Sequence, residues 1–480
     1  MSGFLTLVND CINTFGAAII VPVILYIIAR VMGVPNKKAM ITLFSAAVGL
    51  EGFNLLINSY SGIISPVISQ MVTDSGLSMD VFDLGWQAVS IVAYSTQIGM
   101  LFLALCIVLQ LLLYFTRITN VFQASDLWNN YSYMIWGSLV YVMTKNTWLA
   151  MGCMLTLLMI TTILAEIGAK RWSTYYNYPG CAHASLHAAI TIPFAMIVNW
   201  ICNKLGMYKL KASPADFQKK FGFLGEPMTL GALVGFIIGF IGNLKYLNTL
   251  AGWGSIALCT VATSTIVAVF PRVASLFANA FTPLMEGASK IAHKTNKRGK
   301  ERGQWYLAIN DAANYGETCT LICGIICMPL IFILAFILPG NHVLPVLSLT
   351  AIPYLIVFIV PICNGNMPKV IVTTMVYLII SLYVCTALAE PFTEVALSVG
   401  LQVETGILLV AGYSLMGSPI SFAVTMAWAS GNPLWIVLTI ALTAVVFALG
   451  KIYKPQIIEW MEKEALCDEY VPAETPVKTN

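Results

Sequence analysis

Residues 319–338 read CTLICGIICMPLIFILAFIL, a run of 20 residues without a charged side chain. About 20 apolar residues in a helix cross the ~30 Å hydrocarbon core of a bilayer. Similar runs recur along the whole chain rather than only at its start, which excludes a soluble protein behind a signal peptide. We therefore predict an all-α polytopic membrane protein with about eleven spans, at 12–33, 38–58, 91–115, 147–168, 185–205, 229–249, 250–270, 319–338, 345–361, 367–388 and 433–450.

The composition supports this class. Of the 480 residues, 58% are hydrophobic and 10% are charged, and the mean hydropathy is +0.82. Soluble domains are roughly 25% charged, so no water-soluble fold covers this much apolar surface. Lipid-facing barrel strands alternate apolar and polar residues, which these runs do not. The polar stretches 206–228 and 286–311 and the acidic tail from 459 are each too short for a soluble domain.

Charged residues divide the loops into two kinds. The positive-inside rule places loops rich in Lys and Arg in the cytoplasm. The basic loops carry Arg30, Lys37 and Lys38, then Lys204, Lys209, Lys211, Lys219 and Lys220, then a crowd from Lys290 to Arg302. Loops with Asp74, Asp80 and Asp83, and with Glu390, Glu394 and Glu404, are predicted on the outer side. Lys451 and Lys454 follow the last span and predict a cytoplasmic C-terminus.

The count of crossings leaves the apolar stretch 407–428 with no membrane to cross. Gly412, Gly417 and Pro419 interrupt it, so we interpret it as a re-entrant hairpin, which is tolerated where its backbone is buried or lines a cavity. The alternative is an ordinary Pro-kinked span. In the first half the count of crossings requires that the N-terminus is outside and that the short run 133–143 does not cross the membrane. Lys170 and Arg171 then lie outside, as an exception to the positive-inside rule.

No motif for an energy-yielding reaction is present. The sequence contains no Walker A loop, no GxGxxG after a strand and no nucleophile elbow, so we predict no cofactor and no catalytic residue in this chain. For a transporter, two energy sources then remain, an ion gradient or a coupled reaction on a partner protein. Most of the 12 cysteines lie inside apolar runs and are predicted to be small core residues rather than metal ligands.

The first candidate binding segment is Gly225-Glu226-Pro227, at the mouth of a predicted span. A carboxylate there accepts two hydroxyl hydrogens of a polyol, and the glycine allows a close approach of the backbone. The alternative is that Glu226 caps the helix that follows it.

The second candidate is the hairpin segment from Tyr413 to Ser421, in which Ser418 and Ser421 follow helix-breaking residues. Broken helices at the membrane midplane are where transporters bind solutes. Gly85-Trp86-Gln87 is a partial echo of it in the first half. Two such segments suggest two inverted repeats, which we predict at 1–228 and 229–458, before a cytoplasmic tail at 459–480.

Other polar residues are candidates of a weaker kind. Asp311, Asn314 and Glu317 share one face if their segment is helical, although they are equally typical of a solvated helix start. His183 and His187 are spaced to present two imidazoles on one helix face, for hydrogen bonding rather than for metal. Glu51 lies within an apolar run and either faces a cavity or is hydrated near a membrane surface.

Five short segments together resemble the galactitol-type membrane component (EIIC) of the bacterial sugar phosphotransferase system. They are Asp126-Leu127-Trp128-Asn129, the stretch from Phe221 to Thr229, Phe270-Pro271-Arg272-Val273, Pro339-Gly340-Asn341-His342-Val343-Leu344-Pro345 and Gly417-Ser418-Pro419-Ile420. They follow one another in order over most of the chain. The chain departs from that family at Gly85-Trp86-Gln87, where a Gly-Ser-Ser-Pro tip is expected, and at Gly316-Glu317, where a Gly-His pair is expected.

The resemblance implies a permease of the bacterial plasma membrane that imports a hexitol or related sugar. A separate cytoplasmic EIIB subunit phosphorylates the solute from a phosphocysteine, with EIIA as a further partner. It also implies the fold of the ascorbate permeases, with inverted repeats, hairpins, a homodimer and elevator-like motion. The alternatives are an ion-coupled carrier that uses Glu51, Asp311 or Glu317, and a membrane enzyme that uses His183, His187 and Glu226 on a lipidic substrate.

Overall fold

The computed structural model describes residues 17–31, 33–75, 79, 81–126, 128–210, 227–280, 282, 283, 286, 305–309, 312–345, 348–399 and 409–469. Its first half contains helices α2 (Ala17–Val31), α3 (Asn36–Ser75), α4 (Gly85–Ser95), α5 (Gln97–Phe115), α6 (Tyr131–Thr144), α7 (Thr147–Tyr175), α8 (Leu186–Ala189) and α9 (Ile192–Lys204). Its strands are β1 (Val81–Asp83), β2 (Val121–Phe122) and β3 (Cys181–Ala182), and its short 3-10 turns are Gln123–Ser125, Trp128–Asn130 and Met207–Lys209.

The second half contains α11 (Pro227–Gly242), α12 (Leu250–Asn279), α14 (Ala312–Tyr315), α15 (Thr318–Ile337), α16 (Ile352–Leu355), α17 (Ile359–Ile362), α18 (Met367–Ser398), α19 (Tyr413–Met416), α20 (Pro419–Ala429), α21 (Pro433–Ile452) and α22 (Lys454–Leu466). Its strands are β4 (Tyr306–Ala308), β5 (Val343–Leu344) and β6 (Leu409–Ala411), and its 3-10 turns are Leu244–Tyr246, Leu349–Ala351 and Cys467–Glu469.

Seven helices in the described part of the chain are long and apolar enough to cross a membrane. They lie at 97–115, 147–175, 186–204, 250–269, 318–337, 367–398 and 433–452, each on one of the eleven predicted spans. The prediction of a span at 345–361 is wrong. That stretch contains only the one-turn helices α16 and α17 after a 3-10 turn, and Pro361 has no N–H for the bond that a continuous helix would make to the Val357 carbonyl.

Several of the long helices begin at a side-chain cap. The side-chain oxygens of Asn146, Asn366 and Asn432 accept hydrogen bonds from backbone N–H groups in the first turns of α7, α18 and α21. These N–H groups have no partner within the helix, so the caps fix where each helix starts. The same positions were boundaries in the pattern of apolar runs, which explains why these spans were predicted well.

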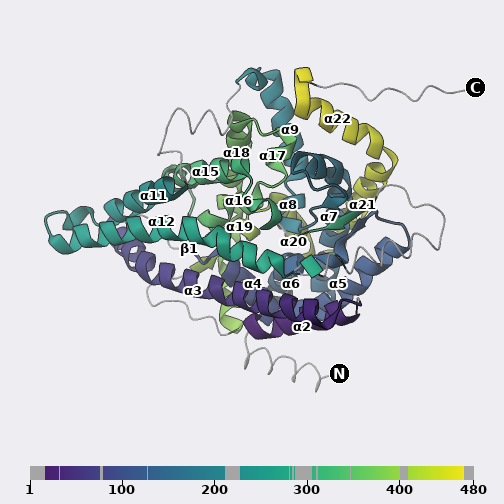
Figure 1. Ribbon diagram of the computed structural model, residues 1–480, viewed down its shortest axis with the longest axis horizontal. Coiled ribbons are helices and arrows are strands. Elements are labelled where there is room, and N and C mark those ends of the chain that lie inside the picture. Colours follow the sequence, from purple (N-terminus) through teal and green to yellow (C-terminus); the bar gives the residue numbers. More distant parts are fainter. Residues whose placement is uncertain are drawn as a thin grey trace, which may run out of the picture.

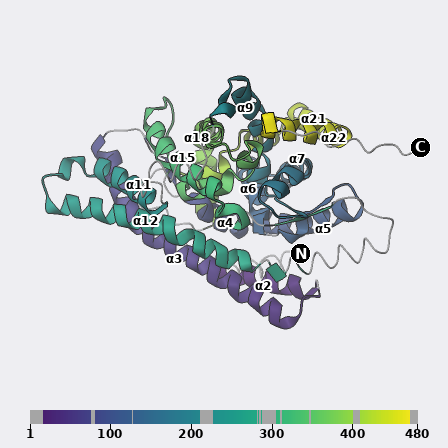
Figure 2. The same ribbon diagram turned by 45° about the horizontal axis from the view of Figure 1, so that its top comes forward.

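Helices α2, α3, α11 and α12 form a separate layer beside the rest of the molecule (Figures 1 and 2). Gly231, Gly235 and Gly239 on α11 face α12 so closely that an added Cβ atom would lie 2.4–3.1 Å from its atoms, among them the Cys259 carbonyl oxygen. Glycines four residues apart allow this backbone-to-backbone packing, a common arrangement between membrane helices. Glu51 is exposed on α3 in this layer and does not face the core.

The described part of the chain is mostly helical, as predicted, and also contains two small parallel sheets of two- and three-residue strands. Sheet A has the strand order β5-β1-β6, and sheet B has the order β2-β4-β3. In each sheet the central strand is the first strand of one half, and the outer strands are the second and third strands of the other half. The two halves therefore exchange one strand with each other.

Asp83 ends the central strand of sheet A and is 0% exposed. Its prediction as a residue of an outer acidic loop is therefore wrong. Hydrophobic neighbours Val81 and Phe82 carry it into the sheet, where backbone and serine donors surround its carboxylate. The charge rule failed here because it reads an acidic residue as a loop residue and takes no account of hydrogen bonding.

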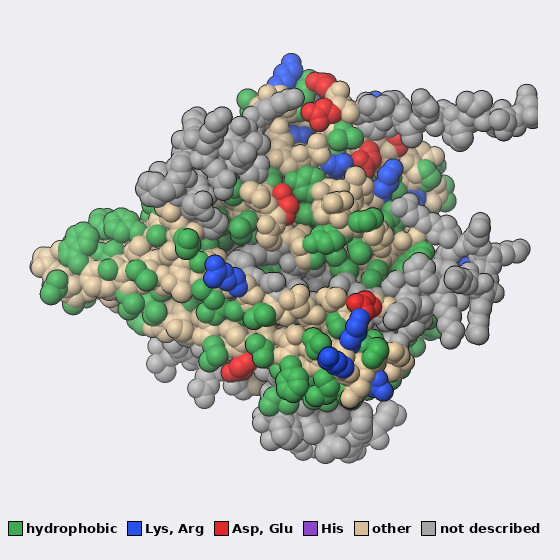
Figure 3. All heavy atoms as spheres, viewed as in Figure 1, with side chains coloured by type: hydrophobic (Ala, Val, Ile, Leu, Met, Phe, Trp, Pro, Cys, Tyr) green, Lys and Arg blue, Asp and Glu red, His purple; other side chains and the backbone are tan. Residues whose placement is uncertain are grey.

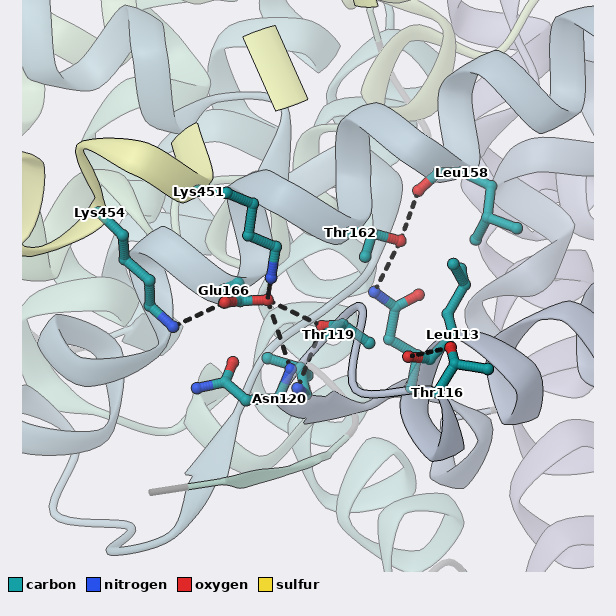
Figure 4. Close-up of polar contacts among 11 residues, drawn as sticks. Leu113, Thr116, Thr119, Asn120, Leu158, Thr162, Glu166, Lys451 and Lys454 are labelled. Atoms are coloured by element: carbon teal, nitrogen blue, oxygen red, sulfur yellow. Dashed lines mark hydrogen bonds and ion pairs between the residues drawn. The ribbon is translucent and has the colours of Figure 1, made fainter. Parts of the chain in front are cut away.

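Several basic residues gather at one end of the molecule, which we call the basic end, namely Arg171, Lys204, Lys369, Lys451 and Lys454. Lys451 and Lys454 donate to Glu166 of α7 at 2.6 and 2.7 Å, where Thr119 and the backbone of Asn120 also donate (Figure 4). Arg171 donates to Glu462 of α22 at 2.9 Å. The sequence placed Arg171 on the opposite side from Lys451 and Lys454, and this prediction is wrong.

The acidic segment from 459 is partly a docked helix rather than a free tail. Helix α22 reaches Leu466, and Glu464 accepts hydrogen bonds from the Asn203 side chain of α9. Lys369 Nζ in turn donates to Asn203 Oδ1 at 3.1 Å. In Figure 3 charged side chains gather over this end, and a second group of charged side chains is visible at the lower right.

The start of α7 lies at the side of the molecule opposite the basic end. Lys145, next to the start of α7, pairs with Glu394 near the end of α18 at 2.8 Å. The Trp428 indole near the end of α20 donates to Thr156 in the first part of α7. The chain between α18 and α21 therefore begins and ends at the same side.

Candidate functional site

Trp86, Tyr131, Tyr354, His183, Ser185 and His187 form a buried group that we call the aromatic–histidine cluster. The ring centroids of Trp86 and Tyr131 lie 6.3 Å apart, with 28° between the ring planes. Tyr131 also stacks on His187, with 6.3 Å between the ring centroids, and the Tyr354 centroid lies 6.1 Å from that of Trp86. Each of these rings is at most 9% exposed, so the cluster is closed to solvent in this conformation.

Ser185 joins the two histidines of the cluster. Its Oγ lies 2.5 Å from His183 Nε2 and 3.3 Å from His187 Nε2, and His183 Nδ1 lies 3.2 Å from the carbonyl oxygen of Ile309. A carbonyl only accepts, so a neutral His183 carries its proton on Nδ1, and its Nε2 accepts from Ser185. Ser185 Oγ then accepts from His187 Nε2–H, which makes Nδ1 of His187 an acceptor.

His183 itself is held rigidly. It is 0% exposed and stacks on Trp172 of α7 at 6.3 Å, while Phe358 meets it from the other side at 5.8 Å. The expectation that His183 and His187 share one helical face is wrong, because His183 follows β3 and only His187 lies in α8. The two side chains still converge, through Ser185 rather than through helical spacing.

The cluster lies where strands of both sheets meet helices. Trp86 comes three residues after β1, and His183 directly follows β3. Tyr131 begins α6, and Tyr354 belongs to α16, which packs against α8 and α14. Short irregular backbone between strand and helix thus brings together side chains that are up to 270 residues apart in sequence. Among the residues that the structure describes, no three His, Cys, Asp or Glu side chains form a possible metal site.

Asp83 positions the start of α4, and with it Trp86. Its Oδ1 accepts from Gly85 N at 3.1 Å, Tyr413 N at 3.0 Å and Ser348 Oγ at 2.7 Å, and its Oδ2 accepts from Ser348 N at 2.6 Å. Gly85 has φ +79°, a left-handed conformation that glycine adopts without strain. One carboxylate therefore ties together the starts of α4 and α19, the two segments that the sequence compared as echoes.

Asn314 lies in α14, directly beyond sheet B. Its side chain is 1% exposed, and neither amide atom has a hydrogen-bond partner among the described residues. Buried amides are normally paired, so an unpaired one is where a polar ligand or water fits. The predicted common face of Asp311, Asn314 and Glu317 is wrong, because α14 ends at Tyr315 and a new helix starts after Glu317. Asp311 lies outside the described residues.

Glu317 has a structural role in this conformation. Its carboxylate caps α15 by accepting from Cys319 N at 3.0 Å and from the backbone and hydroxyl of Thr320, both at 2.7 Å. Ser418 likewise caps α20 by accepting from Ser421 N at 3.1 Å. Ser418 and Ser421 are both buried, and the structure brings neither of them into the aromatic–histidine cluster. Their part in solute binding stays a prediction.

The remaining predicted site residues lie wholly or partly outside the described residues. Gly225 and Glu226 lie outside the described residues, and α11 begins at Pro227. Gln87 belongs to α4, but its side chain is outside the description. Sequence reasoning missed Asp83, Tyr131, Ser185 and Tyr354. Ser185 alone carried a signal, since it stands between the two histidines that the sequence singled out.

Known proteins resemble the chain over most of its length. Residues 11–406 match the family of PTS system sugar-specific permease components, EIIC-GAT. A putative permease IIC component of Escherichia coli K12 is 26% identical over 442 residues, which cover 92% of this chain and 96% of that protein. The galactitol-specific EIIC components of E. coli K12 and O157:H7 are each 26% identical over 421 residues, covering 87% of this chain and 90% of theirs. With its long apolar helices, the chain is a multi-pass membrane protein that belongs to the sugar-specific permease family of the PTS.

Proposed function

We propose that this protein imports galactitol or a related hexitol across the bacterial plasma membrane, while a separate EIIB subunit phosphorylates the solute. The observation that carries the proposal is the aromatic–histidine cluster, a closed and buried group of rings and hydrogen-bonding atoms. The galactitol-specific relatives support the choice of solute.

The chemistry of the cluster suits a polyol. The faces of Trp86, Tyr131 and Tyr354 offer apolar surface to the C–H groups of a sugar alcohol. Its hydroxyl groups both donate and accept, as do Ser185 and a neutral histidine. None of these groups needs a charged partner, whereas an ionic substrate would require one in a buried site.

The described residues fit a division of labour with EIIB and EIIA. The described cysteines are buried in the fold, except for the half-buried Cys181 and Cys467, and most lie within helices. A buried thiol is a poor phosphoryl carrier, because the thiolate is the nucleophile and burial disfavours it. We therefore assign the phosphocysteine to EIIB and the binding of the solute to this chain.

We also propose that the chain consists of two inverted repeats, at 1–228 and 229–458. The exchange of first strands between sheets A and B supports this. It gives β1 the same place in sheet A that β4 has in sheet B, so β1, β2 and β3 correspond to β4, β5 and β6. The helix pairs before β1 and β4, α2 with α3 and α11 with α12, correspond in the same way. We further propose that the protein forms a homodimer.

The orientation follows from the positive-inside rule. We place the basic end and the C-terminus in the cytoplasm, and Lys145 and Glu394 outside, which makes 407–428 a re-entrant hairpin. A cysteine at Lys145 should react with an impermeant thiol reagent added outside intact cells, and a cysteine at Lys170 should react only after the cells are opened. Reaction of both from outside would overturn this orientation.

The solute proposal is tested by uptake of labelled galactitol in cells that supply galactitol EIIA and EIIB. Trp86→Ala should lower uptake at least tenfold, and the accumulated label should be the phosphate ester. Trp148→Ala is the control, because Trp148 is 83% exposed and lies outside the cluster. Unmodified galactitol whose accumulation stops with an uncoupler would instead favour the ion-coupled carrier.

A further inference from the structure

A cavity lies at the side of the molecule opposite the basic end, where α4 ends and α5 begins. Its volume is about 290 Å³. Its walls come from both halves of the chain, namely from the α4–α5 junction, the last turns of α6, the start of α7 and the end of α18. The residues that matter for the argument are Thr96, Gln97, Ser138, Tyr141, Lys145 and Glu394.

Two helices connect this cavity to the aromatic–histidine cluster. Helix α4 begins next to Trp86 of the cluster and ends at Thr96 in the cavity wall, and α6 begins with Tyr131 and passes Tyr141. The two helices pack against each other along this course. Ten residues of helix rise about 15 Å, so the cavity and the cluster lie about that far apart at opposite ends of one helix pair.

The floor of the cavity is closed by its own hydrogen bonds. Thr96 Oγ1 lies 2.8 Å from Ser138 Oγ, and Ser138 Oγ also donates to the Met134 carbonyl at 2.8 Å. Aliphatic side chains complete this floor, namely Ile98, Leu101, Val142, Val395 and Val399. A ligand therefore meets an apolar base in which the polar atoms are already satisfied.

The more exposed part of the cavity wall carries polar groups that can bind a ligand. The Gln97 amide and the Tyr141 hydroxyl make no hydrogen bond to the described residues, and Tyr141 is 38% exposed. Lys145 and Glu394 pair across the cavity at 2.8 Å, with side chains 66% and 60% exposed. Such exposed pairs contribute little to stability, so ligand hydroxyls can replace the contact at small cost.

We propose that this cavity is an outer receiving site, which binds a neutral polyhydroxylated solute before it moves along α4 and α6 to the cluster. The equal and opposite charges of Lys145 and Glu394 give no preference for an anion or a cation, whereas both groups hydrogen-bond to hydroxyls. An apolar base with a ring of donors and acceptors is the usual construction of a small-molecule site. The inference rests on the proposed function, because it takes the same class of solute.

The test measures protection of a cysteine by galactitol. In cells with Gln97→Cys, an impermeant maleimide added outside modifies the new thiol, and the parent protein reports the background from native cysteines. Galactitol should slow this reaction at least threefold. It should do so equally in a Trp86→Ala background, where the cluster is disabled, and in a His187→Gln background if the first variant does not fold.

Each result decides between the two sites. Protection that disappears when the cluster is disabled would overturn the inference, because it would then report closure of the protein around the cluster. Absence of protection while galactitol uptake continues would overturn the inference and leave the proposed function intact. If galactitol gives no protection in Gln97→Cys and the parent protein takes up no galactitol, the proposed function would be overturned as well.

A kinetic comparison provides an independent readout. Tyr141→Phe should raise the KM for galactitol uptake about threefold to tenfold without lowering the maximal rate, because the hydroxyl meets solute before translocation. Tyr246→Phe is a matched control, since Tyr246 is 42% exposed and lies between α11 and α12, away from the cavity. An unchanged KM for Tyr141→Phe, or an equal rise for the control, would overturn the assignment.

Discussion

Sheets A and B share one topology but are held together by different bonds. In sheet A the central strand ends in Asp83, a buried carboxylate that receives four hydrogen bonds. In sheet B the side-chain contacts are made to backbone carbonyl oxygens of the central strand and of the residue that follows it. Ser125 donates to the Ala308 carbonyl at 2.7 Å, and His183 lies 3.2 Å from the carbonyl oxygen of Ile309. One sheet is thus fixed by a charge, and the other by neutral contacts.

The difference suggests different roles for the two sheets. A buried carboxylate is stable only while its partners stay in place, so sheet A resists rearrangement. Neutral hydrogen bonds are weaker and are exchanged more easily for bonds to a ligand. Sheet B also leads directly into His183, Ser185 and Asn314. We infer that sheet A is the scaffold of the centre and that sheet B carries the solute chemistry.

The largest expected effect is that of Asp83→Ala on stability. The change removes the acceptor of three buried backbone N–H groups, each of which costs about 1–3 kcal/mol when left unpaired. We expect a loss of more than about 3 kcal/mol and little folded protein. Thermal unfolding in detergent, followed by size-exclusion chromatography, measures it. Asp74→Ala is the control, because Asp74 pairs with the exposed Lys245 among the described residues, and an equal loss in both variants would contradict the role of Asp83.

Alanine substitutions of two glycines next to the sheets should destabilise the protein for different reasons. A Cβ atom on Gly412, after β6, would lie 2.0 Å from Val89 Cγ2, so Gly412→Ala should cost about 1–3 kcal/mol by overpacking. Val89→Ala removes the clash and should restore much of the loss. Gly180, before β3, has open space but φ +75°, so Gly180→Ala should cost about 1 kcal/mol through backbone strain alone. Rescue of Gly412→Ala is tested in a double-mutant cycle, and failure of the rescue would exclude the packing explanation.

Ser185→Ala should affect solute binding more than stability. It removes the link between His183 and His187 and leaves the rest of sheet B unchanged, so we expect a stability loss of about 1 kcal/mol. Binding of galactitol should weaken at least tenfold, because the orientation of His187 is lost. Ser381→Ala is the control, since Ser381 is also buried and bonds a backbone carbonyl, but outside the cluster. Equal binding losses in both variants would assign sheet B a structural role only.

The sequence predicted the long helices well and the centre poorly. Apolar runs with polar caps, such as the one that begins after Asn146, are visible because every residue of the run carries the signal. Strands such as Val121–Phe122 are too short for any periodic pattern, and each becomes a strand only by pairing with a segment far away in the chain. The strand exchange was therefore beyond prediction from local pattern.

The site was predicted in part for the same reason. His183, His187 and Trp86 were found because histidines and an interrupted segment are unusual within a membrane sequence. Tyr131 and Tyr354 were missed, since aromatic residues are common near membrane surfaces and nothing local distinguishes these two. Asp83 was misplaced because its meaning depends on donors from Ser348 and Tyr413, more than 260 residues away.

The smallest expected effect compares two serines in corresponding places, Ser125 after β2 and Ser348 after β5. Each donates its hydroxyl to the central strand of its sheet, Ser125 to the Ala308 carbonyl and Ser348 to the Asp83 carboxylate, both at 2.7 Å. A hydrogen bond to a neutral acceptor contributes about 0.5–1.5 kcal/mol and one to a charged acceptor about 1.5–3 kcal/mol. Ser348→Ala should therefore destabilise the protein about 1 kcal/mol more than Ser125→Ala.

The backbone N–H of Ser348 continues to hold Asp83 in that variant, which keeps the loss well below that of Asp83→Ala. The two serines belong to different sheets, so the double variant should show the sum of the two single effects within about 0.5 kcal/mol. Thermal unfolding of the three variants in one detergent measures both the order and the additivity. If Ser125→Ala is the more damaging change, sheet B is the more rigid of the two, and the assignment of scaffold and solute chemistry must be reversed.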